Sequence, residues 1–360
     1  MSALPKFDDI SMPDSTIEGP SAWYGPDMDA NTEWLRPFSD TELAELDDAM
    51  RAVKARGDGV IDITRRNFNL PTLGPVLNDT REELLEGRGF VLLRGIPVER
   101  YSIEESAMIY YGIGAHLGYG VPQNGKGHVL GHVKDLGYNH EDTNVRIYQT
   151  AVRQTFHTDG CDFVSLLCLK PAKSGGLSSI VSSVTMFNEM HKWRPDLAAV
   201  LFRPLAVDRR GEVPEGYKGY FDMPPFNWFA GKLSTYYVRR YIQSAERFDD
   251  VTKLSEETLE ALDLFDELAN DPALRLDMEF KPGDIQVLHN HQILHDRTAY
   301  EDWAEPERKR HLLRLWLSPE GARPLPEHFI PRYSSITPGD PGRGGIRTPG
   351  QILNAPLDAV

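Results

Sequence analysis

Residues 156–183 read FHTDGCDFVSLLCLKPAKSGGLSSIVSS, and this stretch shows how the middle of the chain is built. Short apolar runs at residues 164–169 and 179–183 are typical of strands, and the Pro/Gly-containing turn at residues 170–176 separates them. Outward from here, residues 284–288 and 310–317 have the same character. Several short strands with Gly and Pro between them favour a sandwich, jelly roll or barrel over a parallel α/β sheet. The sequence therefore predicts a mainly β fold with helical decoration.

Helices and irregular ends surround this core. A capping-box pattern, Ser39 with Glu42, marks the start of one helix. The other expected elements are a buried strand at residues 88–95, helices at residues 101–117 and 255–270, and a Gly- and His-rich loop at residues 118–144. We expect an irregular arm over residues 1–35, one catalytic domain over residues 36–318 with its β core at roughly 145–318, and an irregular Pro/Gly-rich segment over residues 319–360.

Composition limits the class of protein. The chain has 360 residues, 54 acidic and 39 basic, which gives a net charge of −15. A strongly negative chain repels phosphate backbones, so nucleic acid is not expected as a partner. The sequence shows no apolar run long enough to cross a bilayer, no signal-peptide pattern, and only two cysteines. We expect a cytoplasmic enzyme with a small-molecule substrate and no membrane partner, and leave homo-oligomer formation open.

The first group of reactive residues is His157-Thr158-Asp159. In an extended segment, residues two apart point to the same face, so the imidazole of His157 and the carboxylate of Asp159 can share one metal ion. A lone His-x-Asp pattern is weak evidence, because a polar pair in a surface loop has the same sequence.

The second group lies in residues 284–297, where His289, His291 and His295 fall within seven positions. Any one of them, with His157 and Asp159, would complete the two-histidine, one-carboxylate set that leaves open positions on a non-haem Fe(II) ion. The triad needs only one of the three, so the others are expected to be structural.

The third group is Arg310 and Arg314. The two-residue period of a strand puts both on one face, where guanidinium groups within an apolar strand are costly unless they meet anions. A guanidinium fork suits a carboxylate. The alternative is that both arginines face solvent on an edge strand, with Leu313 and Leu315 buried behind them.

Taken in order, these groups resemble a known family. The order is His-x-Asp, a histidine 138 residues later and an arginine 15 residues further on. From about residue 88 to 317 the chain resembles the taurine dioxygenase-like Fe(II)/2-oxoglutarate-dependent oxygenases, which include gamma-butyrobetaine hydroxylase. FHTDGCD, KPAKSGG, the block from Asn290 to Arg297 and RHLLRLW carry the resemblance. It implies a double-stranded β-helix (jelly roll), with Fe(II), 2-oxoglutarate and O2 as cofactor and cosubstrates.

The resemblance also implies site residues. His157, Asp159 and His295 match the iron ligands. His295 is chosen over His289 and His291 because relatives have an asparagine, here Asn290, five residues before the distal histidine. Arg310 matches the residue that binds the distal carboxylate of 2-oxoglutarate, and Ser178 and Asn290 are expected beside that cosubstrate. Arg314 matches a substrate-binding arginine of taurine dioxygenase.

The expected reaction is oxidation of a C–H bond in a small polar substrate, with release of succinate and CO2. An amino acid or related carboxylate ranks first as substrate, because Arg314 would need an anion. Hydroxylation is the expected outcome, and desaturation or oxidative ring closure would use the same residues. Two further alternatives are a zinc hydrolase with the same three ligands and a non-catalytic jelly roll that binds a carboxylate. His116, His128, His132 and His140 match no zinc spacing and are expected near the substrate instead.

Overall fold

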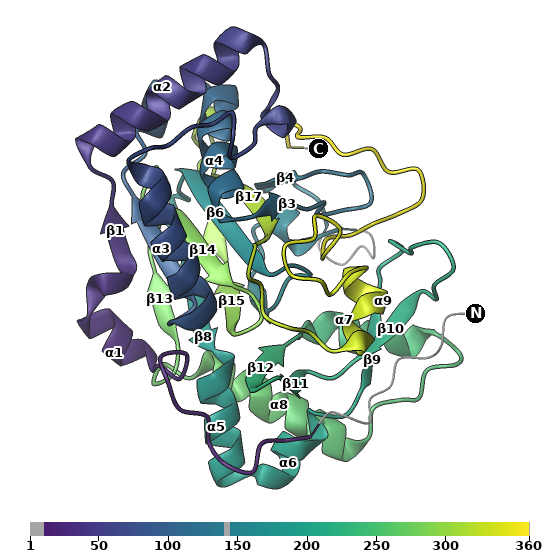
Figure 1. The fold of residues 1–360 in the computed structure, drawn as a ribbon. Coiled ribbons are helices and arrows are strands. Elements are labelled where there is room, and N and C mark those ends of the chain that lie inside the picture. Colours follow the sequence, from purple (N-terminus) through teal and green to yellow (C-terminus); the bar gives the residue numbers. More distant parts are fainter. Residues whose placement is uncertain (1–10, 140–144, 360) are drawn as a thin grey trace.

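Two facing β sheets form the centre of the protein (Figure 1). The computed structural model describes residues 11–139 and 145–359. The larger sheet has the order β1-β2-β14-β6-β17-β3, with β4 paired to β17, and the smaller has the order β13-β8-β15-β5. Their bounds are, for the larger sheet, β1 Leu35–Pro37, β2 Phe90–Arg94, β3 Tyr119–Gly120, β4 Leu130–Val133, β6 Phe163–Lys170, β14 Ile285–His289 and β17 His311–Ser318, and for the smaller, β5 Gln154–His157, β8 Ser178–Ser182, β13 Leu276–Met278 and β15 Ile293–Arg297.

Three small hairpins and a set of helices complete the described chain. The hairpin strands are β7 Ser174–Gly175 with β16 Tyr300–Glu301, β9 Leu205–Asp208 with β10 Tyr220–Met223, and β11 Phe226–Phe229 with β12 Lys232–Thr235. The α-helices are α1 Gly25–Ala30, α2 Asp40–Arg56, α3 Leu73–Glu86, α4 Ile103–Leu117, α5 Ser183–Trp193, α6 Pro195–Val200, α7 Arg239–Ser244, α8 Glu256–Asn270 and α9 Ile330–Tyr333.

The strands of the larger sheet are apolar on both faces because both faces are covered. In β17, Leu313 and Leu315 pack in the cluster beneath α2, α3 and α4, whereas Leu312 and Trp316 pack in the cluster between the two sheets. This alternation follows the two-residue period of a strand. It places the even-numbered side of β17, which includes Arg314, toward the smaller sheet.

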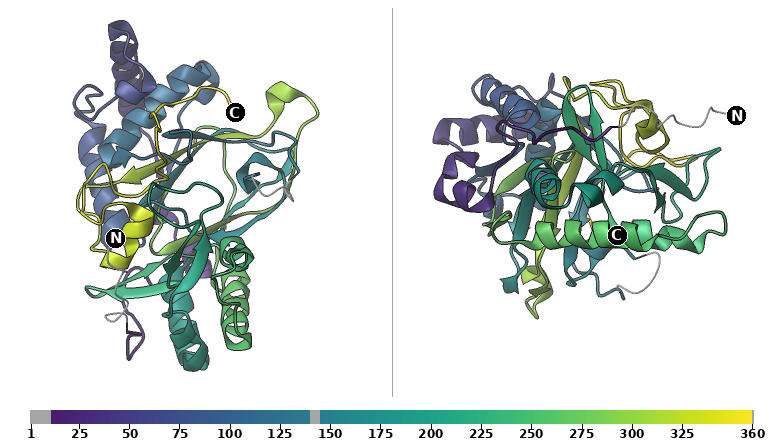
Figure 2. Two further views of the ribbon diagram at one scale, coloured as in Figure 1. Left: turned by 90° about the vertical axis from the view of Figure 1, so that its right-hand side faces the viewer. Right: turned by 90° about the horizontal axis from the view of Figure 1, so that it is seen from below.

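A second group of helices closes the other end of the molecule. Helices α5, α6 and α8 lie at the opposite end from α2 (Figures 1 and 2) and pack with β11 and β12 around a separate apolar cluster.

Side-chain caps start several helices as expected: Ser39 and Glu42 form a capping box at α2, and Ser255 accepts from the Thr258 N–H at α8.

The strands and helices expected from the sequence are confirmed to within one to three residues, but two segments expected to be irregular contain regular structure. The arm expected over residues 1–35 contains α1 and reaches the start of β1. The expected loop at residues 118–144 contains β3 and β4. Strand β4 forms because it pairs with β17 in antiparallel register, Leu315 opposite Leu130, and this contact is nearly 190 residues distant in sequence. Local pattern could not reveal it, because the four residues of β4 have no clear period.

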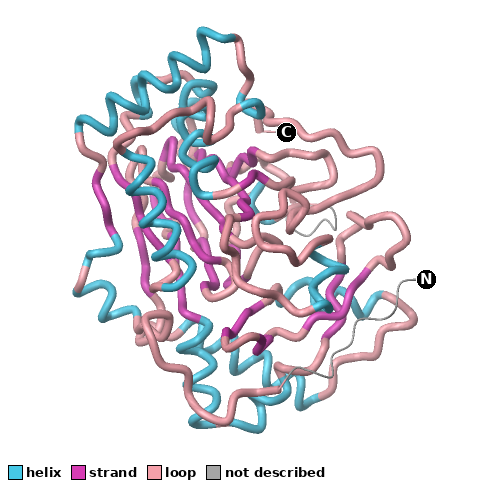
Figure 3. Tube along the Cα trace, in the orientation of Figure 1, coloured by secondary structure: helices cyan, strands magenta, loops and turns pink. Residues whose placement is uncertain are grey.

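The two ends expected to be irregular are built into the core. Trp23 and Trp34, from the N-terminal arm, are buried between the sheets, and Phe329 and Tyr333 belong to the cluster around α8. After β17 the described residues form the short helix α9, a 3-10 turn and an isolated bridge from Asn354 to His128, and they run among the loops on one side of the molecule (Figure 3). In the described parts of the chain no helix has the length and apolar character needed to cross a bilayer.

Candidate active site

Two neighbouring strands bring the three expected ligands together. His157 ends β5, His295 lies in β15, and these two residues are direct partners in the antiparallel register. Their rings lie 4.2 Å apart between centroids. Asp159 follows two residues after His157, with its carboxylate 3.7 Å from His157 Nε2 and 3.8 Å from His295 Nε2. One ligand atom from each residue lies within 4.8 Å of the others.

Hydrogen bonds fix the tautomer of the His157 ring. His157 Nδ1 donates to the carbonyl of Thr155 at 2.9 Å, so Nε2 carries the lone pair and accepts from the Gln154 amide at 2.8 Å. Burial, with His157 alongside, lowers the pKa of His295 to about 3. A neutral imidazole is the form that binds a metal ion.

The carboxylate of Asp159 is kept ionised although its side chain is only 10 % exposed. Burial alone would raise its pKa, but the Arg314 guanidinium at 3.7 Å and the two imidazoles outweigh burial and hold the pKa below its usual value. Trp316 Nε1 also donates to Asp159 Oδ2 at 2.8 Å. Trp316 and Arg314 lie on the same face of β17, so one strand supplies both contacts.

Asn290 holds the His-x-Asp loop in place through the backbone. Its amide oxygen accepts from the Asp159 N–H at 2.7 Å, and its NH2 group donates to the carbonyls of Asp159 at 2.6 Å and Cys161 at 2.9 Å. The side chain is fully buried. All of its hydrogen-bonding atoms are therefore directed at the loop that carries Asp159.

The other two histidines of the cluster lie away from the triad. His291 is bonded through Nε2 to Asp162 at 2.9 Å and is stacked on Tyr333, as expected for a structural histidine. His289 accepts at Nδ1 from Arg323, while its Nε2 has no partner among the described residues. Of the three candidates, His295 alone joins His157 and Asp159 in the described chain.

Two imidazoles and one carboxylate within this spacing fit a single Fe(II) ion. His157 and His295 come from the adjacent strands β5 and β15, Asp159 comes from the loop after β5, and the ring orientation of His157 is set by its bond to Thr155. Outer contacts of this kind fix ligand geometry in metal sites.

A small cavity leads from the triad to Arg310. His157 and His295 line one part of it, and Ser178, Arg297 and Arg310 line another. Arg310 is 3 % exposed, and none of its nitrogens lies within ion-pair distance of a carboxylate of the described chain. Its Nη1 has no hydrogen-bond partner there either. Burial lowers the pKa of Arg310, so an anion is needed to stabilise the charged form.

Arg297 is a second buried cation in this cavity, and the sequence pattern indicated no role for it. It donates to the carbonyls of Thr150, at 2.8 Å, and Val152, and burial, with Arg310 nearby, lowers its pKa to about 10. Ser178, at the start of β8, donates to the side-chain oxygen of Gln286 at 3.2 Å. These groups fit the distal carboxylate of 2-oxoglutarate, since two buried guanidinium groups and a hydroxyl line one cavity.

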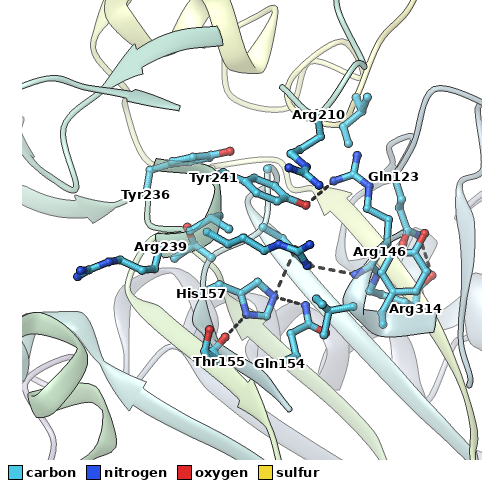
Figure 4. Close-up of a pocket in the computed structure, with 18 of the residues that line it drawn as sticks. Gln123, Arg146, Gln154, Thr155, His157, Arg210, Tyr236, Arg239, Tyr241 and Arg314 are labelled. Atoms are coloured by element: carbon cyan, nitrogen blue, oxygen red, sulfur yellow. Dashed lines mark hydrogen bonds and ion pairs between the residues drawn. The ribbon is translucent and has the colours of Figure 1, made fainter. Parts of the chain in front are cut away.

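A larger cavity of about 460 Å³ opens on the other side of the triad. Aromatic side chains line part of it, including Tyr148. Tyr236 and Tyr241 are seen in Figure 4. Asp159 is the one acidic residue among the described lining, against seven arginines: Arg146, Arg153, Arg210, Arg239, Arg240, Arg314 and Arg332. Such a wall favours an anionic occupant.

Arg314 lies where the strand period predicts, facing this cavity, but it is not unpaired. Its Nε donates to the Gln123 side-chain oxygen at 2.6 Å, and its guanidinium lies 4.6 Å from the ring of Tyr148. Asp159 also lies 3.7 Å from this guanidinium. The expectation that Arg314 needs an anion from the substrate therefore does not hold on burial alone, because the protein itself supplies partners.

The histidines of residues 116–140 do not gather at the triad. His116 bonds to the Phe68 carbonyl, and His132 bonds to His311 and to the Pro356 carbonyl. His128 lies within 3.1 Å of the Asn124 amide. His140 lies outside the described residues.

The fold and the site together define a class: a two-sheet enzyme with a mononuclear site of two histidines and one carboxylate, the non-haem iron dioxygenases that use 2-oxoglutarate. The family model described as "Taurine catabolism dioxygenase TauD, TfdA family" matches residues 54–316. The chain belongs to this family, and its cofactors are Fe(II), 2-oxoglutarate and O2.

Curated relatives extend over most of the chain. FR-33289 synthase of Streptomyces rubellomurinus (strain ATCC 31215) is 31% identical over 314 residues, which cover 86% of this chain and 92% of that protein. Taurine hydroxylase-like protein SAT17 of Stachybotrys chartarum is 32% identical, covering 82% of this chain and 77% of that protein. A uridine-5'-phosphate dioxygenase of a Streptomyces species is 26% identical, covering 71% and 93%.

Solved structures share the fold. Asparagine oxygenase, in complex with Fe(II), 2S,3S-3-hydroxyasparagine and succinate, matches with a TM-score of 0.61 at 15% identity, over 79% of this chain and 93% of that one. The non-haem iron oxygenase OrfP, in complex with Fe and alpha-ketoglutaric acid, matches with a TM-score of 0.59 at 15% identity and the same coverage.

Proposed function

We propose that this dioxygenase oxidises a C–H bond of a small anionic substrate, with His157, Asp159 and His295 as the iron ligands. Arg310, with Ser178, binds the distal carboxylate of 2-oxoglutarate. The observation that carries this assignment is the buried Arg310 guanidinium, which shares a cavity with both histidines and has no carboxylate partner in the described chain. The two facing sheets form the double-stranded β-helix of the family.

Each residue has a defined task in this scheme. The bound iron, with 2-oxoglutarate and O2, supplies the oxidising power, and succinate and CO2 are the coproducts. His157 and His295 would hold the metal ion through their ring nitrogens, burial keeps His295 neutral by lowering its pKa to about 3, and Asp159 supplies the negative charge. Asn290 positions the backbone of Asp159, a role that its contacts support better than direct contact with 2-oxoglutarate.

The zinc hydrolase alternative explains less of the site. A metal-bound water needs no cosubstrate, so it would leave Arg310 and Arg297 buried without an anion. A non-catalytic carboxylate-binding protein would need Arg310 but not a preoriented triad.

We expect an anionic substrate. Seven arginines line the larger cavity, and three of them pair with carboxylates outside its described lining: Arg146 with Glu212, Arg153 with Asp296 and Arg239 with Asp263. Arg332 has no carboxylate within 4.0 Å in the described chain, and an anion in the cavity would balance its charge. Two substrate classes fit this wall. An amino acid or related carboxylate agrees with the solved neighbours, whose ligands are hydroxyasparagine and hydroxyarginine. A phosphate ester agrees with the relatives named uridine-5'-phosphate dioxygenase. Hydroxylation is the proposed outcome; desaturation and ring closure would use the same residues.

One experiment tests the proposed function. The protein is incubated in air with Fe(II), 2-oxoglutarate and a panel of amino acids, small amines and phosphate monoesters. Succinate release and product mass are measured, with the chelated protein as control. We expect succinate that depends on Fe(II), and a product heavier by one oxygen atom. No succinate under any condition would contradict the proposal.

The cytoplasmic location, the lack of a nucleic-acid partner and the oligomeric state stay predictions.

A further inference from the structure

Arg332 reaches the active site from the part of the chain that follows the matched family region. It lies in α9, beyond residue 316, and lines the larger cavity together with His157 and Asp159. Its Nε donates to the Tyr236 hydroxyl at 3.0 Å, and its Nη1 donates to the Gly345 carbonyl at 2.6 Å. The side chain is therefore held at two points while it faces the cavity.

The guanidinium of Arg332 lies directly against the residue that follows Asp159. A Cβ atom added to Gly160 would lie 1.4 Å from Arg332 Nη2, so any other residue at position 160 would exclude this arginine from its place. The absence of a side chain at Gly160 brings a cation next to the loop that carries the metal ligand.

Arg332 differs from other cations of the cavity in having no carboxylate partner. Arg146 is paired with Glu212, and Arg239 is paired with Asp263 at 2.7 Å. No carboxylate of the described chain lies within 4.0 Å of Arg332, whose bonds go to a hydroxyl and a carbonyl. A partly buried guanidinium without a counter-charge is costly, and an anion in the cavity would remove that cost.

Arg314 approaches the same loop. Its guanidinium lies at Asp159, one residue before the glycine that Arg332 contacts. Under the proposed function, the metal ion takes up the charge of Asp159. Arg314 then has only Gln123 as a close polar partner in the described chain and can pair with an external anion. Two guanidinium groups thus approach consecutive residues at one end of the cavity.

We propose that Arg332 and Arg314 together bind a phosphate- or phosphonate-type group of the substrate, with Arg332 as the specificity-determining residue. The inference rests on the proposed function and narrows its substrate class. A tetrahedral oxyanion presents three terminal oxygens and close to two negative charges, so it can accept from the remaining N–H groups of both guanidinium groups and balance both positive charges. A carboxylate carries one negative charge, so it would balance only one of the two cations. The cavity volume of about 460 Å³ leaves room for an organic group beyond the oxyanion.

The test compares three probes that share one organic group: phenyl phosphate, phenylphosphonate and benzoate. Their binding to the anaerobic Fe(II)–2-oxoglutarate enzyme is measured by calorimetry, with 2-oxoglutarate saturating so that the Arg310 site is filled. We expect the wild type to bind the phosphate and the phosphonate at least about tenfold more tightly than benzoate. Arg332→Gln should lose roughly tenfold or more for the first two probes and little for benzoate, with Arg332→Lys in between.

Control measurements separate charge loss from misfolding and from failure of the proposed function. Arg203→Gln removes a surface arginine that is paired with Glu257 and should bind all three probes like the wild type. Thermal unfolding of each variant and its binding of 2-oxoglutarate are recorded in parallel. Equal affinity of Arg332→Gln and wild type for phenyl phosphate would overturn the inference. So would tighter binding of benzoate, or no binding of any probe to a wild type that binds Fe(II) and 2-oxoglutarate. Failure of the wild type to bind 2-oxoglutarate would instead overturn the proposed function.

Discussion

Asp159 is contacted by groups that each favour its ionised form. Trp316 donates to one oxygen at 2.8 Å, and the Arg314 guanidinium lies 3.7 Å away. A carboxylate must be deprotonated to bind a metal ion, so these contacts prepare the ligand before the metal arrives. Arg310 is the opposite case: its buried guanidinium lies 5.1 Å from the ring of Tyr300 but has no carboxylate partner in the described chain, because that partner is expected to be a cosubstrate.

The first residue-scale prediction concerns Arg310→Lys. Lysine keeps the charge but loses the two parallel N–H bonds that a guanidinium makes to a carboxylate. We expect the apparent constant for 2-oxoglutarate to rise roughly tenfold or more, while Fe(II) affinity stays the same. Succinate release measured against 2-oxoglutarate concentration checks this. Unchanged cosubstrate dependence would refute the assignment of Arg310.

The second concerns Asn290→Ala. This change removes three hydrogen bonds to the backbone of Asp159 and Cys161 and leaves the side chains of the three proposed metal ligands unchanged. Loss of such outer support typically costs about 10–100-fold in metal affinity. We expect Fe(II) or Co(II) affinity, measured by anaerobic titration, to fall by that order. If affinity for the metal is kept and only the 2-oxoglutarate constant rises, Asn290 contacts the cosubstrate instead.

At the scale of elements, the chain after β17 is locked onto the His-x-Asp loop by a buried ion pair. Arg343 donates to both oxygens of Asp162, at 2.6–3.1 Å, and both side chains are fully buried. His291 bonds to the same carboxylate at 2.9 Å. This network joins three segments that are far apart in sequence, and it holds the C-terminal segment where Arg332 can reach the cavity.

Arg343→Leu is the prediction at this scale. Breaking a buried pair by removing one partner leaves an uncompensated charge and typically costs about 3–5 kcal/mol. We expect the free energy of unfolding, measured with urea, to fall by that amount. The double variant Asp162→Asn/Arg343→Leu should recover part of the loss, because no charge then stays buried. A double variant less stable than the single one would show that the carboxylate is stabilised mainly by His291.

For the whole molecule, buried histidines away from the metal site make stability depend on pH. Burial lowers the pKa of His311 to about 3 and that of His328 to about 4, against an ordinary value of 6.5. His328 is 1 % exposed and bonds to Asn227 Oδ1 at 2.7 Å. Between about pH 4 and 6.5 the unfolded chain binds protons that the folded chain does not, so stability rises with pH over this window.

The corresponding prediction is that chelated, metal-free protein loses stability as the pH falls from about 7 to about 5. Each such histidine contributes up to roughly 1.4 kcal/mol per pH unit. His328→Gln keeps a donor for Asn227 but cannot be protonated, so its pH slope should be shallower than that of the wild type. Urea unfolding at the two pH values measures both slopes. If the stability of His328→Gln and of the wild type changes with pH by the same amount, His328 is not held neutral in the folded protein.

The sequence by itself determined the parts of this protein that depend on near neighbours. Apolar runs predicted the strands, the Ser39 capping box predicted the start of α2, and the two-residue period put Arg310 and Arg314 on one side of a strand. The spacing of His157 and Asp159 likewise predicted a shared ligand site. These features follow from backbone geometry over a few residues, which a local pattern records.

Only the tertiary structure decided how distant segments meet. The residues alone left His289, His291 and His295 open, and the choice of His295 came from the family resemblance; the physical reason is the register of β15 against β5, which puts His295 opposite His157. The partners of Arg314 come from another loop and from Asp159, and Arg332 comes from a segment with no recognisable pattern. Such contacts depend on strand register and chain packing across more than a hundred residues. A local sequence pattern carries no information about them, because the energy that selects them arises only when the whole core is assembled.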